Sequence, residues 1–174
     1  IASKMINARA ETIAEKPAFK GLFAKKRCLI PMDGFYEWKA GSPDGPLTAK
    51  GNPAKQPMFI HRIDGEPLAV AGLWTAWKDP EAGGRWLQSA AVVTTSANET
   101  MQPVHDRMPV IVPASKWHEW LDPDNHEELL HLMDEVERGQ RIAQPRVRHR
   151  LQQDRVGLQR CAHRLVGHGE TVHF

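Results

Sequence analysis

Short apolar runs separated by turn residues are the feature that most limits how this chain can fold. Residues 58–63, 68–74 and 89–95 are rich in strand-forming side chains. A turn at 64–67 predicts that the first two runs pair as antiparallel strands, and a second turn is expected at 79–85. Several short strands at close spacing favour a mostly antiparallel, barrel-like β core and disfavour a doubly wound sheet.

The remaining segments add helices to this core. Residues 17–26 predict a short helix, and residues 127–138 carry apolar side chains at helical spacing. Trp117 and Trp120 also recur at helical spacing, and we interpret them as core residues rather than as platforms for stacking bases. For residues 5–13 both a helix and a strand stay open. The expected fold class is therefore α+β, with helices flanking the β core.

One domain is enough for a chain of 174 residues. We expect this domain to cover residues 1–140. Residues 141–174 are crowded with arginines and have little apolar periodicity, which predicts a basic, disordered or atypical tail. Within the domain, the basic triplet at 25–27 forms the end of the first helix and is expected to be a solvated cap. Residues 39–57 are expected to form a surface loop.

Composition excludes several classes of protein. No apolar run approaches the ~20 residues of a membrane-spanning helix, and no signal-peptide pattern opens the chain, so we expect a cytoplasmic location. The net charge of +2 permits a nucleic-acid partner without arguing for one. Cys28 and Cys161 are too few for a disulfide framework. Cys161, His163, His168 and His173 match no strong zinc spacing, so no metal and no cofactor is expected.

A carboxylate lies inside an aromatic run at residues 34–38. As a strand, this run puts Phe35 and Glu37 on one face and Tyr36 and Trp38 on the other. Apolar surroundings raise the pKa of a carboxyl group, which would let Glu37 exchange protons near neutral pH. The alternative is an edge strand with Glu37 facing water.

Two further polar segments suggest chemistry. Asn7, Arg9 and Glu11 occupy alternate positions, so a strand would line them up on one face. His105 lies in a loop just before an expected strand. Taken together, Asn7, Glu37 and His105 are candidates for one acid/base centre, and we expect their side chains to converge on one groove.

Five motifs stand in order between Asn7 and about Asp122. They are NARAET at 7–12, CLIPMDGFYEW at 28–38, AGLW at 71–74, TTSAN at 94–98 and HDRMP at 105–109. Together they resemble the SOS response-associated peptidase (SRAP) family. The resemblance implies an SRAP-like fold that senses abasic sites in single-stranded DNA and crosslinks to them covalently.

The resemblance also implies a nucleophile that the printed chain does not contain. In the family it is a cysteine at the mature N-terminus, exposed by autoproteolytic maturation, whose amine and thiol condense with the abasic aldehyde to give a thiazolidine. Cys28 and Cys161 cannot replace it, because their backbone nitrogens are amides. We therefore expect the chain as printed, which starts at Ile1, to lack the N-terminal segment and the crosslinking activity.

Residue roles follow from the same resemblance. Glu37 is expected to shuttle protons during Schiff-base formation and self-processing, and His105 to assist sugar ring opening and crosslink reversal. Asn7 is expected to hold the cysteine or the sugar by hydrogen bonds. The DNA-binding residues expected are Arg9, Thr94 and Arg107.

Two alternatives to an SRAP-type peptidase with lyase-like activity stay open. The chain is a non-catalytic module that binds single-stranded DNA, or it is a thiol peptidase that cleaves other proteins. In all three hypotheses we expect a monomer without a membrane partner, nucleoid-associated if the source is bacterial.

Overall fold

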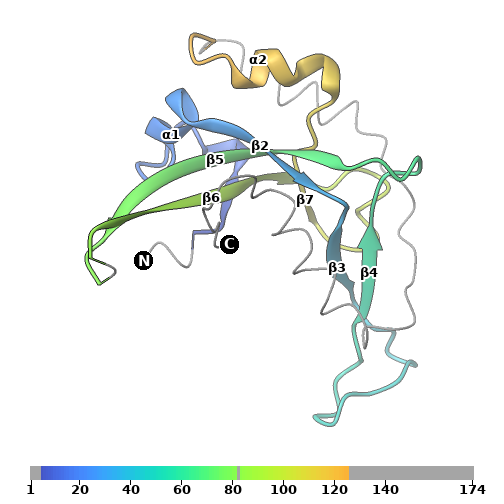
Figure 1. Ribbon diagram of the computed structural model, residues 1–174. Coiled ribbons are helices and arrows are strands. Elements are labelled where there is room, and N and C mark those ends of the chain that lie inside the picture. Colours follow the sequence, from blue (N-terminus) through green and yellow to red (C-terminus); the bar gives the residue numbers. More distant parts are fainter. Residues whose placement is uncertain (1–4, 82, 126–174) are drawn as a thin grey trace.

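A long hairpin of two strands, β5 (Leu68–Asp79) and β6 (Arg85–Ser96), forms the centre of the fold in the computed structural model, which describes residues 5–81 and 83–125 (Figure 1). β2 (Arg27–Met32) pairs with β5, while β1 (Asn7–Arg9) and β7 (Arg107–Pro109) both pair with β6. All pairs are antiparallel except β1–β6, which is parallel. The expected α+β, mostly antiparallel class is confirmed, although the sheet formed by these residues does not close into a barrel.

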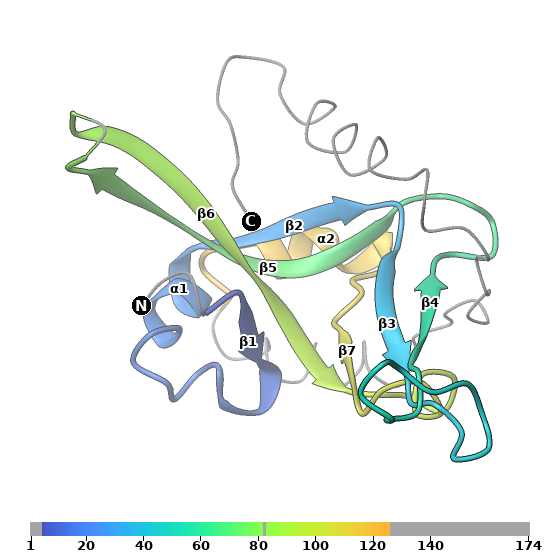
Figure 2. The ribbon, with the colours of Figure 1, turned by 90° about the horizontal axis from the view of Figure 1, so that it is seen from below.

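A separate hairpin and short helices complete the architecture. β3 (Phe35–Lys39) and β4 (Gln56–Ile60) form a second, two-stranded sheet that turns sharply away from the first (Figure 1). The helices are α1 (Lys20–Lys25) and α2 (Trp117–Leu121), with short 3₁₀ turns η2 (Ala10–Thr12) and η3 (Ala114–Lys116). Seen from below, the tip of the β5–β6 hairpin reaches beyond the other strands (Figure 2).

β5 and β6 separate beyond Val92, and the chain that follows His105 fills the gap. The Val110 N–H donates to the Val93 carbonyl of β6 at 2.9 Å, and the Val110 carbonyl accepts from Ala71 of β5 at 2.8 Å. The backbone groups that the separation exposes are thereby satisfied. This inserted segment fixes the place where the loop carrying His105 leaves the sheet.

Both helices cover one face of the large sheet. Side chains of alternate strand residues point to this face, as expected for a half-buried sheet. The cluster under the helices includes Ala8, Ile13, Phe23, Ala71, Leu73, Val93, Val110 and Trp120. The opposite face has a smaller buried cluster of Ile30, Leu68 and Val70, and its β1 edge remains exposed for a site.

Arg27 lies buried between the two helices, with 7% of its surface exposed. Its Nε donates to the Trp120 carbonyl at 2.7 Å, and its Nη2 donates to the carbonyl of Asp122. Its Nη1 donates to the carbonyls of Phe23 at 2.6 Å and Ala24 at 2.8 Å. The terminal carbonyls of α1 and α2 thus share one guanidinium. The prediction of a solvated cap at 25–27 is wrong for Arg27, because its partners on α2 lie more than 90 residues away in the sequence.

Burial has an electrostatic consequence for Arg27. Removal from water lowers the pKa of the guanidinium below its usual range, and the Asp122 carboxylate partly offsets this effect. The carbonyl partners explain how a cation remains buried here.

The two predicted core tryptophans differ in their surroundings. Trp120 is buried, and its indole N–H donates to the carbonyl of Cys28 at 2.8 Å. Trp117 is 43% exposed, although its indole N–H donates to the Val112 carbonyl at 2.9 Å. The core interpretation is confirmed for Trp120 and wrong for Trp117, the first residue of α2, which lies at the surface.

The predicted pairing of strands 58–63 and 68–74 is also wrong. The turn between them exists, with Gly65 at a φ of 76°, but β4 pairs with β3 and β5 pairs with β2 and β6. The reason lies at Gly34, where a Cβ atom would stand only 2.7 Å from the Phe59 ring. The missing side chain lets the start of β3 lie close to β4. The two strands therefore pair with each other, and β4 does not pair with β5.

Other local predictions are confirmed. Gly83 and Gly84 take positive φ values of 68° and 80° in the turn between β5 and β6. For residues 5–13, where helix and strand both stayed open, the structure has a strand and a 3₁₀ turn over residues 7–12. The expected helix at 17–26 is the shorter α1. The predicted helix at 127–138 and the tail at 141–174 lie outside the described residues. Within those that are described, no helix is long and apolar enough to cross a membrane.

Replacing Arg27 with Lys tests the shared guanidinium. Lysine keeps the charge but cannot donate from a planar fork to carbonyls on two helices, so we expect Arg27→Lys to lower the free energy of unfolding by about 3 kcal/mol. Urea denaturation measures this difference. The control is Arg62→Lys, where an exposed guanidinium pairs with Asp64, and its expected change is below ~0.5 kcal/mol. Equal losses in the two variants would contradict the role assigned to Arg27.

Candidate active site

β1 presents Asn7 and Arg9 on the face of the sheet that the helices leave uncovered. Both residues are exposed, whereas Ala8 between them is fully buried. In the parallel register Asn7 lies beside Val92 and Arg9 beside Thr94 on β6. Two of the predicted site residues, Asn7 and Arg9, therefore share one face, and Thr94 joins them there.

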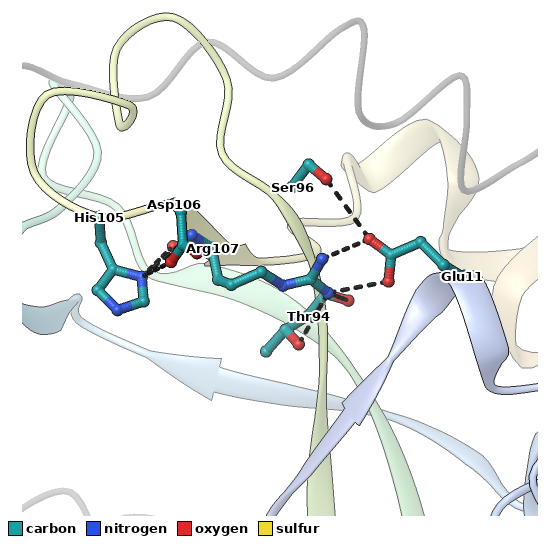
Figure 3. Close-up of polar contacts among 6 residues, drawn as sticks. All are labelled: Glu11, Thr94, Ser96, His105, Asp106 and Arg107. Atoms are coloured by element: carbon teal, nitrogen blue, oxygen red, sulfur yellow. Dashed lines mark hydrogen bonds and ion pairs between the residues drawn. The ribbon is translucent and has the colours of Figure 1, made fainter.

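Arg107 connects three segments at this place (Figure 3). Its Nη1 pairs with Glu11 Oε1, and its Nη2 donates to Glu11 Oε2 at 3.0 Å. The same Nη2 donates to the Thr94 carbonyl at 2.7 Å and lies 3.3 Å from Thr94 Oγ1. The Arg107 side chain is only 19% exposed. The structure thus ties the loop before β7 to β6 and to η2.

Glu11 is a site residue that the sequence candidates omitted. The hydrogen bond from Arg107 holds the pKa of the Glu11 carboxyl below its usual value of 4.5, and burial opposes this shift. The Ser96 hydroxyl also lies 3.5 Å from Glu11 Oε1. The alternation of polar residues at 7, 9 and 11 was the available signal, but β1 ends at Arg9 and η2 carries Glu11 to its partner.

His105 lies in the loop at the other end of Arg107 (Figure 3). Its backbone N–H donates to the Met101 carbonyl at 3.0 Å. Its ring Nδ1 accepts a hydrogen bond from the Arg107 backbone N–H at 3.0 Å, and the Asp106 carboxylate lies 3.1 Å from the same nitrogen. The Arg107 carbonyl lies 3.3 Å from this nitrogen as well. A nitrogen that accepts from the Arg107 N–H carries no proton, whereas one that donates to Asp106 or to the Arg107 carbonyl does, so the two states are alternatives.

Glu37 reaches this region from the second sheet. It is partly buried on β3, on the same face as Phe35, and its cross-strand neighbour is Met58. Phe35 and Met58 pack in an apolar cluster with Met101 and other residues of the loop that carries His105. The strand and its alternation are confirmed, and they turn Glu37 toward the side of the hairpin that meets this loop.

The aromatic residues of the hairpin's other face form their own stack. The Tyr36 and Phe59 rings lie 4.9 Å apart, and Phe59 stacks on His61 at 5.4 Å. Trp38 is exposed on this face. The aromatic run therefore does not enclose Glu37; its apolar neighbours are Phe35 and Met58.

The structure brings some of the candidate residues together and leaves others apart. Arg9, Thr94 and Arg107 meet across β6, and His105 stands two residues from Arg107. In the described part of the chain, the polar side-chain contacts of His105 are with Asp106 and Arg107. Direct convergence of His105 with Asn7 and Glu37 stays a prediction.

Among the residues described, no group of His, Cys, Asp and Glu side chains is arranged to hold a metal ion. Cys28 is a free thiol on β2, and burial raises its pKa to about 11. A thiol of this kind is a poor nucleophile at neutral pH, because the thiolate is the reactive form. Cys161 and the histidines near it lie outside the described residues.

Comparison with known proteins decides the family. The sequence model of the family described as SOS response associated peptidase (SRAP) matches residues 1–153. The chain belongs to the SRAP family. The resemblance carried by the five motifs is thereby confirmed.

Relatives of this SRAP chain carry a common description. The abasic site processing protein YoqW of Bacillus subtilis (strain 168) is 45% identical over 125 residues, which cover 72% of this chain and 51% of YoqW. The abasic site processing protein HMCES of Xenopus tropicalis is 38% identical over 138 residues, covering 68% of this chain and 38% of HMCES. The SRAP chain thus spans about half the length of YoqW and less of HMCES.

Solved structures support the same fold. A phage-related protein of Bordetella bronchiseptica is 35% identical with a TM-score of 0.56, over 82% of this chain and 63% of that protein. A Bacteroides thetaiotaomicron protein gives a TM-score of 0.64 at 27% identity, over 79% of this chain and 54% of its own. The architecture described above is therefore that of known members of the fold.

The Glu11–Arg107 pair predicts a pH dependence of stability. Because folding lowers the pKa of Glu11, its ionised form stabilises the fold above about pH 4.5, and this contribution disappears as the pH falls through the folded value. We expect Glu11→Gln to lower the free energy of unfolding by less than ~1 kcal/mol at pH 7, since 45% of the side chain is exposed. The difference from the wild type should shrink as the pH falls below 4.5.

Urea denaturation over this pH range measures the effect. Glu66→Gln, which changes an exposed carboxyl in the turn after β4, is the control and should show no such change with pH. A Glu11→Gln difference that stays constant over the whole range would show that the ion pair is not what lowers the pKa.

Proposed function

We propose that this SRAP chain forms part of an abasic-site processing protein that acts on single-stranded DNA. The observation that carries the proposal is the exposed face where Arg9 and Thr94 lie beside the loop of His105. A guanidinium suits a phosphate, and an imidazole can transfer protons near neutral pH. The descriptions of YoqW and HMCES as abasic site processing proteins support the same substrate.

A covalent crosslink is the proposed chemistry. The amine of a cysteine at the mature N-terminus attacks the aldehyde carbon of the opened sugar, and loss of water gives an imine. The thiol sulfur then adds to the imine carbon while its proton passes to the nitrogen, which closes a thiazolidine. The ring traps an adduct that would otherwise hydrolyse back to the aldehyde.

Three residues of this chain have proposed roles in that sequence. His105 assists opening of the sugar ring and reversal of the crosslink, and Glu37 takes and returns protons as the imine forms. Asn7 holds the cysteine or the sugar by hydrogen bonds, since an amide does not titrate. Glu37 also serves the autoproteolytic step that exposes the cysteine, so peptidase activity is directed at the protein itself.

Single-stranded DNA is the proposed partner because the missing base leaves the sugar accessible without base flipping. Arg9 and Thr94 are the proposed DNA contacts, while the predicted DNA contact of Arg107 competes with its ion pair to Glu11. We propose action in the cytoplasm as a monomer, associated with the nucleoid in a bacterium, during the response to DNA damage.

Crosslinking to DNA that contains an abasic site tests the proposed function. The complete gene product should give a covalent DNA–protein band that is resolved by denaturing electrophoresis. Glu37→Gln and His105→Asn should each slow band formation by about 100-fold, because each removes a proton-transfer group. Glu66→Gln, at an exposed turn, is the matched control and should retain the wild-type rate.

Two results would count against the proposal. Absence of the band with the wild-type protein would exclude crosslinking. Salt-dependent binding of single strands that Glu37→Gln leaves unchanged, without a covalent band, would favour a non-catalytic binding module.

The Cys28 thiol should take no part in the reaction. With a pKa of about 11, it is ~0.1% ionised at pH 8, compared with about a quarter for an ordinary thiol. In a Cys161→Ser background, we therefore expect iodoacetamide to alkylate Cys28 about 200-fold more slowly in the folded protein than in urea. Mass spectrometry measures the rate. Fast labelling of folded protein, or loss of the crosslink in Cys28→Ala, would contradict this assignment.

A further inference from the structure

Arg107 holds two different parts of the site at once. Its backbone N–H donates to His105 Nδ1 at 3.0 Å, while its guanidinium pairs with Glu11 and donates to the Thr94 carbonyl at 2.7 Å. In Figure 3 the side chain runs from the His105 loop to Glu11, with Thr94 beside the guanidinium. Anything that moves the Arg107 side chain therefore acts on the backbone group that contacts the imidazole.

Glu11 is the anchor at the far end. It belongs to η2, which follows β1 directly, and β1 carries Asn7 and Arg9. The ion pair therefore joins the segment that carries Asn7 and Arg9 to the loop that carries His105. The fork of the guanidinium matches the two carboxylate oxygens, a geometry that lysine cannot reproduce.

We propose that Glu11 and Arg107 are positioning residues that fix the orientation and the tautomer of His105. While the ion pair holds Arg107, its backbone N–H keeps Nδ1 as a hydrogen-bond acceptor. The proton of the neutral imidazole then lies on Nε2, the nitrogen that is left to meet a substrate. This inference rests on the proposed function only for the role of His105 in the reaction; the orientation and tautomer of the ring do not depend on it.

Asp106 supplies the competing state. Its carboxylate lies 3.1 Å from Nδ1, and the Arg107 carbonyl lies 3.3 Å from the same nitrogen. Both oxygens accept only if Nδ1 is protonated, which leaves Nε2 without a proton. β3, which packs against this loop through Phe35 and Met101, carries the charged residues Glu37 and Lys39. Without the Arg107 N–H in place, Asp106 would favour the Nδ1–H tautomer.

A different role for Arg107 makes an opposite prediction. If the guanidinium served mainly as a phosphate contact, Glu11 would compete with DNA for it. Removing the Glu11 charge would then strengthen DNA binding. If Arg107 is a positioning residue, removing that charge loosens the His105 loop and slows the reaction, with no gain in binding.

The tautomer of His105 can be measured without DNA. Long-range ¹H–¹⁵N correlation spectra of the complete protein, at a pH where the ring is neutral, distinguish a protonated from an unprotonated ring nitrogen. We expect Nε2–H in the wild type and in Asp64→Asn, which breaks the exposed Arg62–Asp64 pair. In Glu11→Gln and Arg107→Lys we expect a mixture of the two tautomers.

The reaction supplies a second measurement. We expect Glu11→Gln and Arg107→Lys to slow crosslinking by about 10- to 100-fold, as small displacements of a catalytic group do, while Asp64→Asn leaves the rate unchanged. DNA affinity should change by less than about twofold in Glu11→Gln, which retains Arg107 and loses only a negative charge.

Three outcomes would overturn the inference. They are an Nδ1–H tautomer in the wild type, an unchanged tautomer in both variants, and a Glu11→Gln protein that binds DNA more tightly and crosslinks at the wild-type rate. If the wild-type protein forms no crosslink, the proposed function fails, and the spectra still decide whether the ion pair positions His105.

Discussion

The buried guanidinium of Arg27 is the interaction on which the arrangement of the large sheet depends. It gathers carbonyl groups from α1 and α2 at the start of β2, and the Trp120 ring lies 6.0 Å from it. Both helices are too short to be stable by themselves, so they need such tertiary partners. By fixing the helices to one face of the sheet, Arg27 leaves the opposite face of β1 and β6 for Asn7, Arg9 and Thr94.

The position of His105 is then set by the segment that follows it, which is inserted between two strands. The segment after His105 enters between β5 and β6 and binds both through backbone hydrogen bonds. Strands are rigid compared with loops, so the short connection between this segment and His105 leaves the ring little freedom. Arg107, the first residue of β7, adds the ion pair with Glu11. His105 lies in a loop, but its position is thereby stabilised by the strands β5 and β6 and by the 3₁₀ turn η2.

Local features were predicted correctly from the sequence, whereas contacts between residues far apart in the chain were not. Alternation placed Phe35 and Glu37 on one face, and two glycines located the turn after β5. The partner of β4 was wrong, because a strong turn signal says nothing about a competing strand about 20 residues earlier. The burial of Arg27 and the Glu11–Arg107 pair also escaped prediction, since each joins residues more than 90 positions apart. The family resemblance, rather than spacing, singled out Asn7, Glu37 and His105 as candidates, and their joint role stays a prediction.

The absence of a side chain at Gly34 affects where Glu37 lies. The chain leaves the large sheet and enters the hairpin of Glu37 at this residue, and the Phe59 ring occupies the space of an absent side chain. A methyl group at position 34 would clash with the Phe59 ring and tilt the β3–β4 hairpin relative to the large sheet. Glu37 lies in the middle of β3, so the tilt of this hairpin bears on the distance between its carboxylate and the loop of His105.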